Sequence, residues 1–387
     1  MEIDFEKLGN EFRSIYSARP RFFCAPGRVN LIGEHTDYND GFVMPFAIDR
    51  EAVVAGRVRD DRTISVVALD IGESAEIDLG SPPVKLRKSW VDYIEGTARC
   101  VAERFGTING ADIILTSTVP IGAGLSSSAA IEIAIGYALL SLNDVSIDRR
   151  ELALAAQQAE HEFAGTRSGI MDQFTAVFAI AGNAMLLDCR SLEIESIPVE
   201  FDATEIVVVD TKVKHDLASS AYNTRRQECE TGVRLLAEYI EGLSSLRDVT
   251  VENLETYGDR LPDNILRRCR HVVLENARTL EAARAFRDRE FERAGELMTA
   301  SHVSLRDNYE VSSAELDHLV ETALAVDGVF GARMTGGGFG GCTVNLVRKD
   351  AVEELRERST ASYIRRFGSE PGFYVFKATD GASEVTF

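Results

Sequence analysis

The sequence predicts a mixed α/β protein of two domains, and three observations support this prediction. Strand-like apolar runs alternate with helix-like segments along the whole chain. With 387 residues, the chain exceeds the length of about 250 to 300 residues at which single cores stop growing. The run EIVVVD at 205–210 indicates a buried strand that begins a second unit. We therefore predict one domain over residues 1–200 and another over residues 201–387.

The first half is expected to place strands and helices around two glycine-containing motifs. Strand-like runs predict strands at 21–24, 51–58, 63–68, 111–117 and 183–188. Helix-like segments predict helices at 90–105, 127–141 and 148–163. The segment 192–199 leads into the second half.

The second half is expected to be mainly helical and to close with strands. Helices are predicted at 219–240, 269–287, 290–300 and 314–324. Strands follow at 329–335 and 343–348, then a helix at 350–367 and a last strand at 372–377. This last strand could pair with either half.

The composition narrows the classes of function. The formal net charge of −20 opposes attachment to nucleic acid or to anionic lipid. No segment has the roughly 18 consecutive apolar residues of a membrane-spanning helix, so we expect no membrane partner. The six cysteines lack CxxC spacing, which favours a reducing cytoplasm over a zinc site or a disulfide framework. We expect a cytoplasmic monomer or weak homo-oligomer.

Residues 27–41, GRVNLIGEHTDYNDG, concentrate hydrogen-bonding groups directly after a strand-like segment. The apolar run 29–32 ends at Gly33, and Arg28 stands just before it. A solvated loop would explain this pattern, and so would a surface that binds a ligand through directional hydrogen bonds. Spacing alone leaves both explanations open.

Residues 119–140, VPIGAGLSSSAAIEIAIGYALL, follow a predicted strand and lead into a predicted helix. Ser126 to Ser128 are expected at the N-cap and in the first turn of that helix. Such a turn offers backbone N–H groups and the positive end of a helix dipole to a phosphate. The loop lacks the lysine of GxxxxGK[ST], so a P-loop fold is not indicated. An ordinary capped helix is the alternative.

Residues 333–347, RMTGGGFGGCTVNLV, carry five glycines in the six positions 336–341. Glycine costs about 0.5 to 1 kcal/mol relative to alanine in a regular element, so this density indicates a need for positive φ or close backbone approach. A strand-to-strand bulge and a loop beside a phosphate both fit.

Four side chains are candidates for acid, base or binding roles. Asp172, in SGIMDQF, could be a partly buried general base or the N-cap of the next helix. Glu160, in QQAEHEF, could be functional or a solvated helix carboxylate. His35 has no second ligand at metal spacing and is expected to form hydrogen bonds. Tyr222 lies on an amphipathic helix, where an aromatic residue often belongs to the core.

The stretches 27–41, 119–140 and 333–347 resemble, in order and spacing, the three signature motifs of the GHMP kinases. The first stretch resembles the signature of the galactokinase branch, which other members lack. The resemblance implies an N-terminal α/β domain, a C-terminal α/β domain with a ferredoxin-like sheet, and an active site between them. It also implies ATP as co-substrate and Mg²⁺ as cofactor.

The resemblance also implies roles for the residues of the acceptor site. Asp172 is expected to be the catalytic base, and Arg28 is expected near the anomeric hydroxyl and the transferring phosphate. The residues expected to contact the sugar are Glu34, His35, Thr36, Asp37 and Tyr222.

On the nucleotide side, the resemblance implies a phosphate loop and two metal ligands. The loop residues are Gly122, Ala123, Gly124, Leu125, Ser126, Ser127 and Ser128. Ser128 and Glu160 are the implied Mg²⁺ ligands. The glycine run 336–341 is expected to support this region from the other domain.

The implied activity is phosphorylation of the C1 hydroxyl of galactose by ATP, the kinase step of galactose catabolism. One alternative is a kinase for N-acetylgalactosamine, galacturonate or arabinose, although HTDYNDG favours galactose over N-acetylgalactosamine. The other is a sensor that binds sugar and ATP without turnover. Such sensors lack two residues of the serine loop, whereas Ser128-Ala129-Ala130 is present here.

Overall fold

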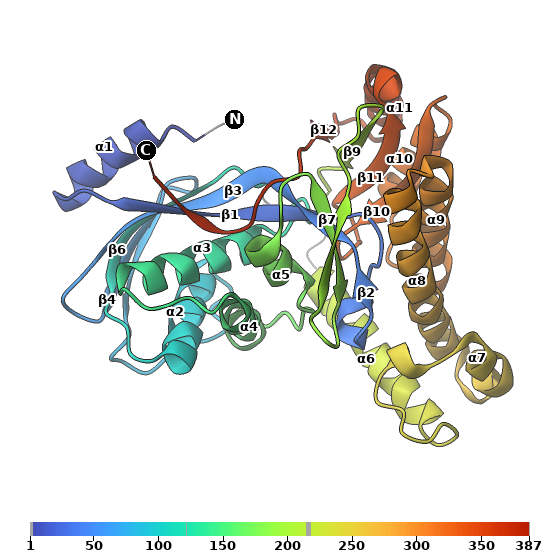
Figure 1. The fold of residues 1–387 in the computed structure, drawn as a ribbon, viewed down its shortest axis with the longest axis horizontal. Coiled ribbons are helices and arrows are strands. Elements are labelled where there is room, and N and C mark those ends of the chain that lie inside the picture. The colour runs from blue at the N-terminus through green and yellow to red at the C-terminus, as the bar shows by residue number, and fades with distance from the viewer. Residues whose placement is uncertain (1–2, 121, 214–217, 387) are drawn as a thin grey trace.

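A six-stranded sheet forms the centre of the first half of the chain (Figure 1). The structure is a computed structural model that describes residues 3–120, 122–213 and 218–386. The strand order is β13-β1-β3-β6-β4-β5, and among these described strands only β4 and β6 pair in parallel. The strands are β1 (Arg21–Asn30), β3 (Pro45–Val58), β4 (Thr63–Ala68), β5 (Glu73–Asp78), β6 (Ala111–Ser117) and β13 (Ser383–Val385).

Helices lie on both sides of this sheet (Figure 1). On one side, α1 (Phe5–Tyr16) packs through Leu8 and Phe12. On the other side are α2 (Val91–Phe105), α3 (Ser127–Leu142), α4 (Arg149–Ala159) and α5 (Met171–Phe178). Because α3 is apolar around most of its surface, it is buried against β1 and β3, which fixes its N-terminus. No described helix is both long and apolar enough to cross a membrane.

An antiparallel sheet of order β10-β11-β9-β12 forms the second half. Its strands are β9 (Thr204–Asp210), β10 (Val329–Thr335), β11 (Cys342–Arg348) and β12 (Gly372–Val375). This order, with helices between β9 and β10 and between β11 and β12, is the expected ferredoxin-like arrangement. The helices are α6 (Ala218–Leu236), α7 (Val251–Tyr257), α8 (Asp263–Asp288), α9 (Phe291–Ser304), α10 (Ala314–Leu324) and α11 (Val352–Phe367).

A small sheet of the first half contacts α8 of the second half, and the two halves share one apolar core. The small sheet has the order β2-β7-β8, with β2 (Phe42–Val43), β7 (Asn183–Asp188) and β8 (Ile194–Pro198). The largest apolar core includes Phe46 and Ile133 from the first half and Val208 and Phe286 from the second.

Most predicted elements are confirmed, and several differ at their ends. The strands β4, β6, β7 and β10 and the helix α10 have the predicted bounds. The helix predicted over 148–163 is wrong at its end, because α4 stops at Ala159 and a π-helical segment, Glu160–Ala164, follows. The predicted last strand pairs with β9, whereas the unpredicted β13 returns to β1. A division near residue 200 stays a prediction.

Candidate active site

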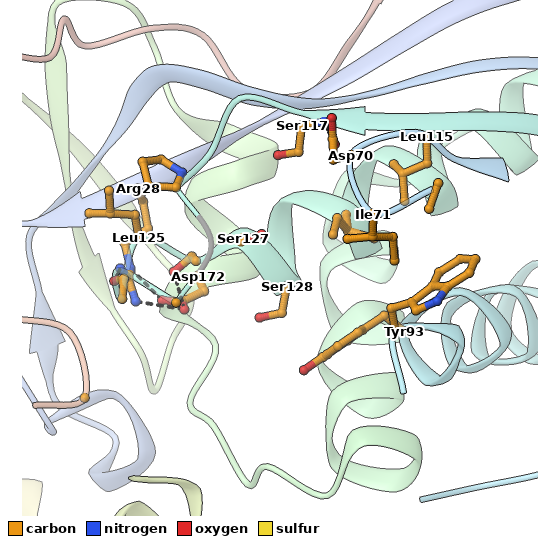
Figure 2. A pocket seen from close by; sticks show the side chains of 18 residues that line it. Arg28, Asp70, Ile71, Tyr93, Leu115, Ser117, Leu125, Ser127, Ser128 and Asp172 are labelled. Carbon is orange, nitrogen blue, oxygen red and sulfur yellow. Dashed lines mark hydrogen bonds and ion pairs between the residues drawn. The ribbon is translucent and has the colours of Figure 1, made fainter. Parts of the chain in front are cut away.

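Two adjoining cavities lie beside β1, α5 and the loop that connects β10 with β11. Their volumes are about 500 Å³ and about 130 Å³. Arg28, Asp172 and Gly337 line both, so the cavities share one wall. Figure 2 shows the larger cavity, with Arg28 and Asp172 at one end and Ile71 and Tyr93 at the other.

Arg28 reaches the shared wall at an irregularity of β1. The register of β1 against β3 shifts between Pro26 and Arg28, and such bulges re-aim side chains. Buried Arg28 donates from Nε to Oδ1 of Asp172 (2.7 Å), from Nη2 to Oδ2 (2.8 Å) and from Nη1 to the Gly124 carbonyl (2.7 Å). Burial acts to lower the pKa of Arg28, but the charges of Asp172 and Glu34 raise it, so the guanidinium stays charged.

Asp172 lies in the first turn of α5. The N-cap of this helix is Ile170, so the alternative that Asp172 is the cap is wrong. Its Oδ2 also accepts a hydrogen bond from the hydroxyl of Ser126. Because 22% of the side chain is exposed, a bound molecule can reach the carboxylate from either cavity.

The loop 122–128 lines the larger cavity with all its residues except Ala123. Gly122, Gly124 and Ser126 have positive φ (75°, 75° and 58°), which turns the chain sharply into α3. Ser126 is the N-cap residue, as predicted, but its side chain makes no capping bond because its hydroxyl donates to Asp172. The first turn of α3 therefore begins at the cavity, and the Ser126 side chain does not cap its backbone N–H groups.

The glycine turn 336–341 packs directly on the backbone of this loop. A Cβ at Gly336 would lie 3.0 Å from the carbonyl oxygen of Gly124, and one at Gly341 would lie 3.2 Å from that of Ala123. Both glycines also have positive φ. The run forms the turn between β10 and β11 rather than a strand bulge, and its glycines permit the close approach that their density indicated.

Ser128, in the first turn of α3, and Glu160 lie within hydrogen-bond distance of each other. The Ser128 hydroxyl donates to Glu160 Oε1 (3.1 Å), and Gln173 Nε2 donates to Oε2 (3.1 Å). Glu160 begins the π-helical segment, a distortion that is frequent at functional sites. Burial, with the Asp172 charge as a lesser cause, raises the pKa of Glu160. The described residues contain no group of three or more His, Cys, Asp and Glu side chains arranged for a metal ion.

The smaller cavity gathers most of the residues expected to contact a sugar. Glu34, His35, Asp37 and Tyr222 all line it. The ring of Tyr222 is 5.3 Å from that of His35, so Tyr222 belongs to the cavity wall rather than to the core alone. His35 is bonded through Nδ1 to the Tyr38 hydroxyl (2.8 Å), and burial lowers the pKa of its imidazole to about 3. His35 is therefore neutral near pH 7.

Asp37 occupies a site that only glycine at position 169 leaves open. A Cβ on Gly169 would lie 2.0 Å from Asp37 Cγ. Burial raises the pKa of Asp37 to about 7, and the charges of Asp172 and Glu34 act in the same direction. The Asp37 carboxyl thus changes its charge close to neutral pH.

Thr36 is placed differently from its neighbours. It is fully buried, and its hydroxyl lies 2.8 Å from the Gly33 carbonyl oxygen and 2.7 Å from that of Phe42. It is not among the residues that line the smaller cavity. Thr36 therefore holds the turn that presents Glu34, His35 and Asp37, and its contact with a sugar stays a prediction.

Sequence reasoning missed other residues of both cavities. The larger cavity has an apolar end formed by Ala68, Ile71, Trp90, Tyr93, Leu115 and Ile131. The smaller cavity also includes Thr166, Ser168 and Met171. Trp90 is the single tryptophan of the chain, a signal that could have drawn attention to it. The others carry no local signal, because they meet only through the fold.

Known protein families and structures agree with this geometry. Residues 10–58 match the galactokinase galactose-binding signature, 92–179 the N-terminal domain of GHMP kinases and 282–365 their C-terminal domain. Galactokinase of Chloroflexus aurantiacus is 46% identical, covering 97% of this chain and 98% of its own. Galactokinase of Chloroflexus aggregans is 48% identical, covering 92% of this chain and 94% of its own.

A solved structure extends the likeness to the whole fold. The crystal structure of Lactococcus lactis galactokinase complexed with galactose has a TM-score of 0.94 and 34% identity, covering 98% of this chain and 100% of its own. These matches confirm the predicted two-domain α/β architecture of the GHMP kinases. The chain therefore belongs to the galactokinase family of the GHMP kinases and is a sugar kinase that uses ATP.

Proposed function

We propose that this enzyme transfers the γ-phosphate of ATP to the C1 hydroxyl of D-galactose and releases α-D-galactose 1-phosphate and ADP. The observation that carries the proposal is the wall formed by Arg28 and Asp172, which two cavities share. A phosphate donor in one cavity and an acceptor hydroxyl in the other would meet at this wall. The galactose-binding signature over residues 10–58 supports galactose as the acceptor.

The larger cavity suits the nucleotide. Its apolar end, with Ile71, Trp90 and Tyr93, suits a base, and its other end is lined by Ser126, Ser127 and the rest of the glycine loop. Phosphates at that end would accept hydrogen bonds from the backbone amides at the start of α3 and would lie at the positive end of its dipole.

The smaller cavity suits a neutral polyol. Its carboxylates, Glu34 and Asp37, would accept hydrogen bonds from sugar hydroxyls, while the Tyr222 hydroxyl can donate or accept. Directional groups of this kind reject an acceptor that lacks the matching hydroxyl, because a buried polar group is then left unpaired.

At the shared wall, Asp172 would take the proton of the C1 hydroxyl as the bond from oxygen to phosphorus forms. Arg28 would hold this carboxylate in its orientation, and it would stabilise charge on the transferring phosphoryl group. Phosphoryl transfer requires mainly positioning and charge neutralisation, because its transition state is loose.

The pair Ser128 and Glu160 fits Mg²⁺. A hydroxyl and a carboxylate supply hard oxygen donors, and these two lie 3.1 Å apart beside the phosphate loop. Mg²⁺ at protein sites typically uses one or two carboxylates together with substrate phosphates and waters. Bound there, the ion would neutralise charge on the ATP phosphates.

A sugar panel tests the proposal. Purified protein with Mg²⁺ and ATP would be assayed for ADP release with galactose, N-acetylgalactosamine, galacturonate and arabinose. Galactose should be phosphorylated fastest. A faster reaction with another of these sugars would reassign the substrate, and absence of ADP with all four, despite galactose binding, would favour a sensor.

We also infer a cytoplasmic enzyme that is a monomer or weak homo-oligomer. The six cysteines are free and buried, which agrees with a reducing compartment. Cell fractionation and light scattering of the purified protein test these two points.

A further inference from the structure

The two carboxylate oxygens of Glu34 have different surroundings. Oε1 accepts the backbone N–H of Gly336 (2.8 Å) and lies 3.1 Å from Thr335 Oγ1 and 3.3 Å from Arg333 Nη2. Within the described residues, the hydrogen bonds of this carboxylate are made by Oε1, which is also the carboxylate oxygen nearest to the Arg333 guanidinium. Because Glu34 lines the smaller cavity, Oε2 is the oxygen available to a ligand there.

Arg333 supplies the positive charge beside Glu34. Its side chain is fully buried, and its Nη1 donates to the Asn30 carbonyl (3.2 Å). Its Nε and Nη2 have no hydrogen-bond partner among the described residues. Burying a guanidinium is costly unless its charge is paired, and Glu34 is the carboxylate at ion-pair distance. Its charge also helps to lower the pKa of Glu275, which contacts Arg278.

Thr335, like Arg333, contacts the Asn30 carbonyl and the Glu34 carboxylate. Residues two apart on a strand share a face, so both side chains extend from β10 toward the end of β1. The single hydroxyl proton of Thr335 is shared between the Asn30 carbonyl (2.9 Å) and Glu34 Oε1 (3.1 Å). Thr335 thereby attaches the end of β1, and Glu34 beyond it, to the sheet of the second half.

We propose that Arg333 and Thr335 are positioning residues of the sugar site. They hold Oε1 of Glu34 so that Oε2 faces the cavity, and they thereby set the affinity for the acceptor sugar without contacting it. The inference rests on the proposed function, since it takes galactose as the ligand of Glu34.

Thr335→Val tests this role with almost no change of shape. Loss of a hydrogen bond to a charged group should raise both the KM and the Kd for galactose about 10-fold. The KM for ATP should change less than about twofold, and Thr335→Ser should restore galactose binding, because only the hydroxyl is at issue. Galactose Kd would be measured by titration calorimetry on the full chain.

Two further sets of variants separate positioning from general damage. Thr97→Val is the matched control: Thr97 is buried in α2, its hydroxyl has no partner among the described residues, and both KM values should stay unchanged. Arg333→Lys keeps the charge but loses the planar fork, so it should weaken galactose binding less than Arg333→Met. Melting temperatures would identify any variant that fails to fold.

An unchanged galactose KM in Thr335→Val would overturn the inference, as would an equal rise in the KM values for galactose and ATP. Wild-type protein is titrated first. If it neither binds nor phosphorylates galactose, the proposed function fails and the inference falls with it. If wild-type protein is active and Thr335→Val is normal, the inference alone fails.

Discussion

Arg28 and Asp172, 144 positions apart, are joined by two hydrogen bonds between the guanidinium fork and the carboxylate, of 2.7 and 2.8 Å. The third arginine nitrogen binds the Gly124 carbonyl (2.7 Å), so the same side chain also holds the phosphate loop. Bidentate pairing of this kind adds geometric specificity as well as energy. The proposed base is thereby oriented relative to the phosphate loop before any substrate is bound.

Asp172→Asn should reduce turnover by about 10² to 10⁴, the usual range for loss of a general base. The amide keeps the size of the carboxylate but cannot accept the C1 proton at neutral pH. Galactose Kd should change little, because Glu34 and Asp37 remain in the cavity. Single-turnover rates and calorimetric Kd would be measured together, and near-normal turnover would contradict the assigned role.

Arg28→Lys should lower kcat about 10- to 100-fold although the charge is kept. An ammonium cannot donate two parallel hydrogen bonds to Asp172 and also bind the Gly124 carbonyl in the arginine geometry. Steady-state kinetics would measure the loss. Arg57→Lys is a suitable control, since Arg57 pairs with Asp112 near the C-terminal end of β3, outside both cavities. Equal activity of Arg28→Lys and wild type would show that the bidentate geometry is unimportant.

Galactose affinity should rise with pH near neutrality. The folded-state pKa of Asp37 is about 7, chiefly because of burial, and only the ionised form accepts a hydrogen bond at both oxygens. The KM for galactose should therefore fall about 5- to 10-fold between about pH 6 and about pH 8. His35 and His271, with pKa values of about 3 and about 4, remain neutral over this range and cannot cause the change.

Titration of the Asp37 carboxyl should also change the stability of the fold, which should fall as the pH rises. Its pKa is about 4 in the unfolded chain, so between about pH 4 and about pH 7 the folded state binds more protons than the unfolded state. The contribution of Asp37 to stability is thus present below about pH 4 and is lost as pH rises to about 7. Asp37→Asn should abolish both the KM dependence and this part of the pH dependence of urea unfolding. A pH-independent galactose KM in wild-type protein would rule out titration of Asp37.

Gly169→Ala should weaken galactose binding at least about 10-fold, by steric displacement of Asp37. The added Cβ would lie 2.0 Å from Asp37 Cγ, and Gly169 is not in the left-handed region, so backbone strain is not the cause. Gly9→Ala in α1 is the control: its Cβ would be 3.3 Å from the Phe22 ring, and it lies in neither cavity. Galactose KM and melting temperature would be compared, and a normal KM in Gly169→Ala would contradict this packing.

Elements with a clear apolar pattern were predictable from local sequence, whereas distorted ones were not. The strands β4 and β6 and the helix α10 have the expected bounds because their pattern and their flanking residues agree. The change from α4 to a π-helical turn at Glu160 has no local signal. Its carboxylate is held by Ser128, Ser168 and Gln173, which only the fold brings to it.

The residues of the candidate site likewise divide into those that local sequence predicts and those that it does not. The motifs named Arg28, Glu34, His35 and Asp37, and the structure brings all four to one small cavity. Thr36, within the same motif, turns its hydroxyl to the backbone instead, because the tight turn consumes it. Trp90 and Tyr93 were missed, since their place in the larger cavity depends on how α2 packs on α3.

Patterns within the sequence were enough to predict the α/β class, the order of the three motifs and the chemical types of the residues they carry. The folded chain was needed to show that Asp172 is held by Arg28, that Gly169 leaves room for Asp37, and that Arg333 and Thr335 contact Glu34. A sequence pattern depends on neighbours within a few residues. A buried charge or a close backbone contact depends on partners more than a hundred positions away, which only the folded chain brings together.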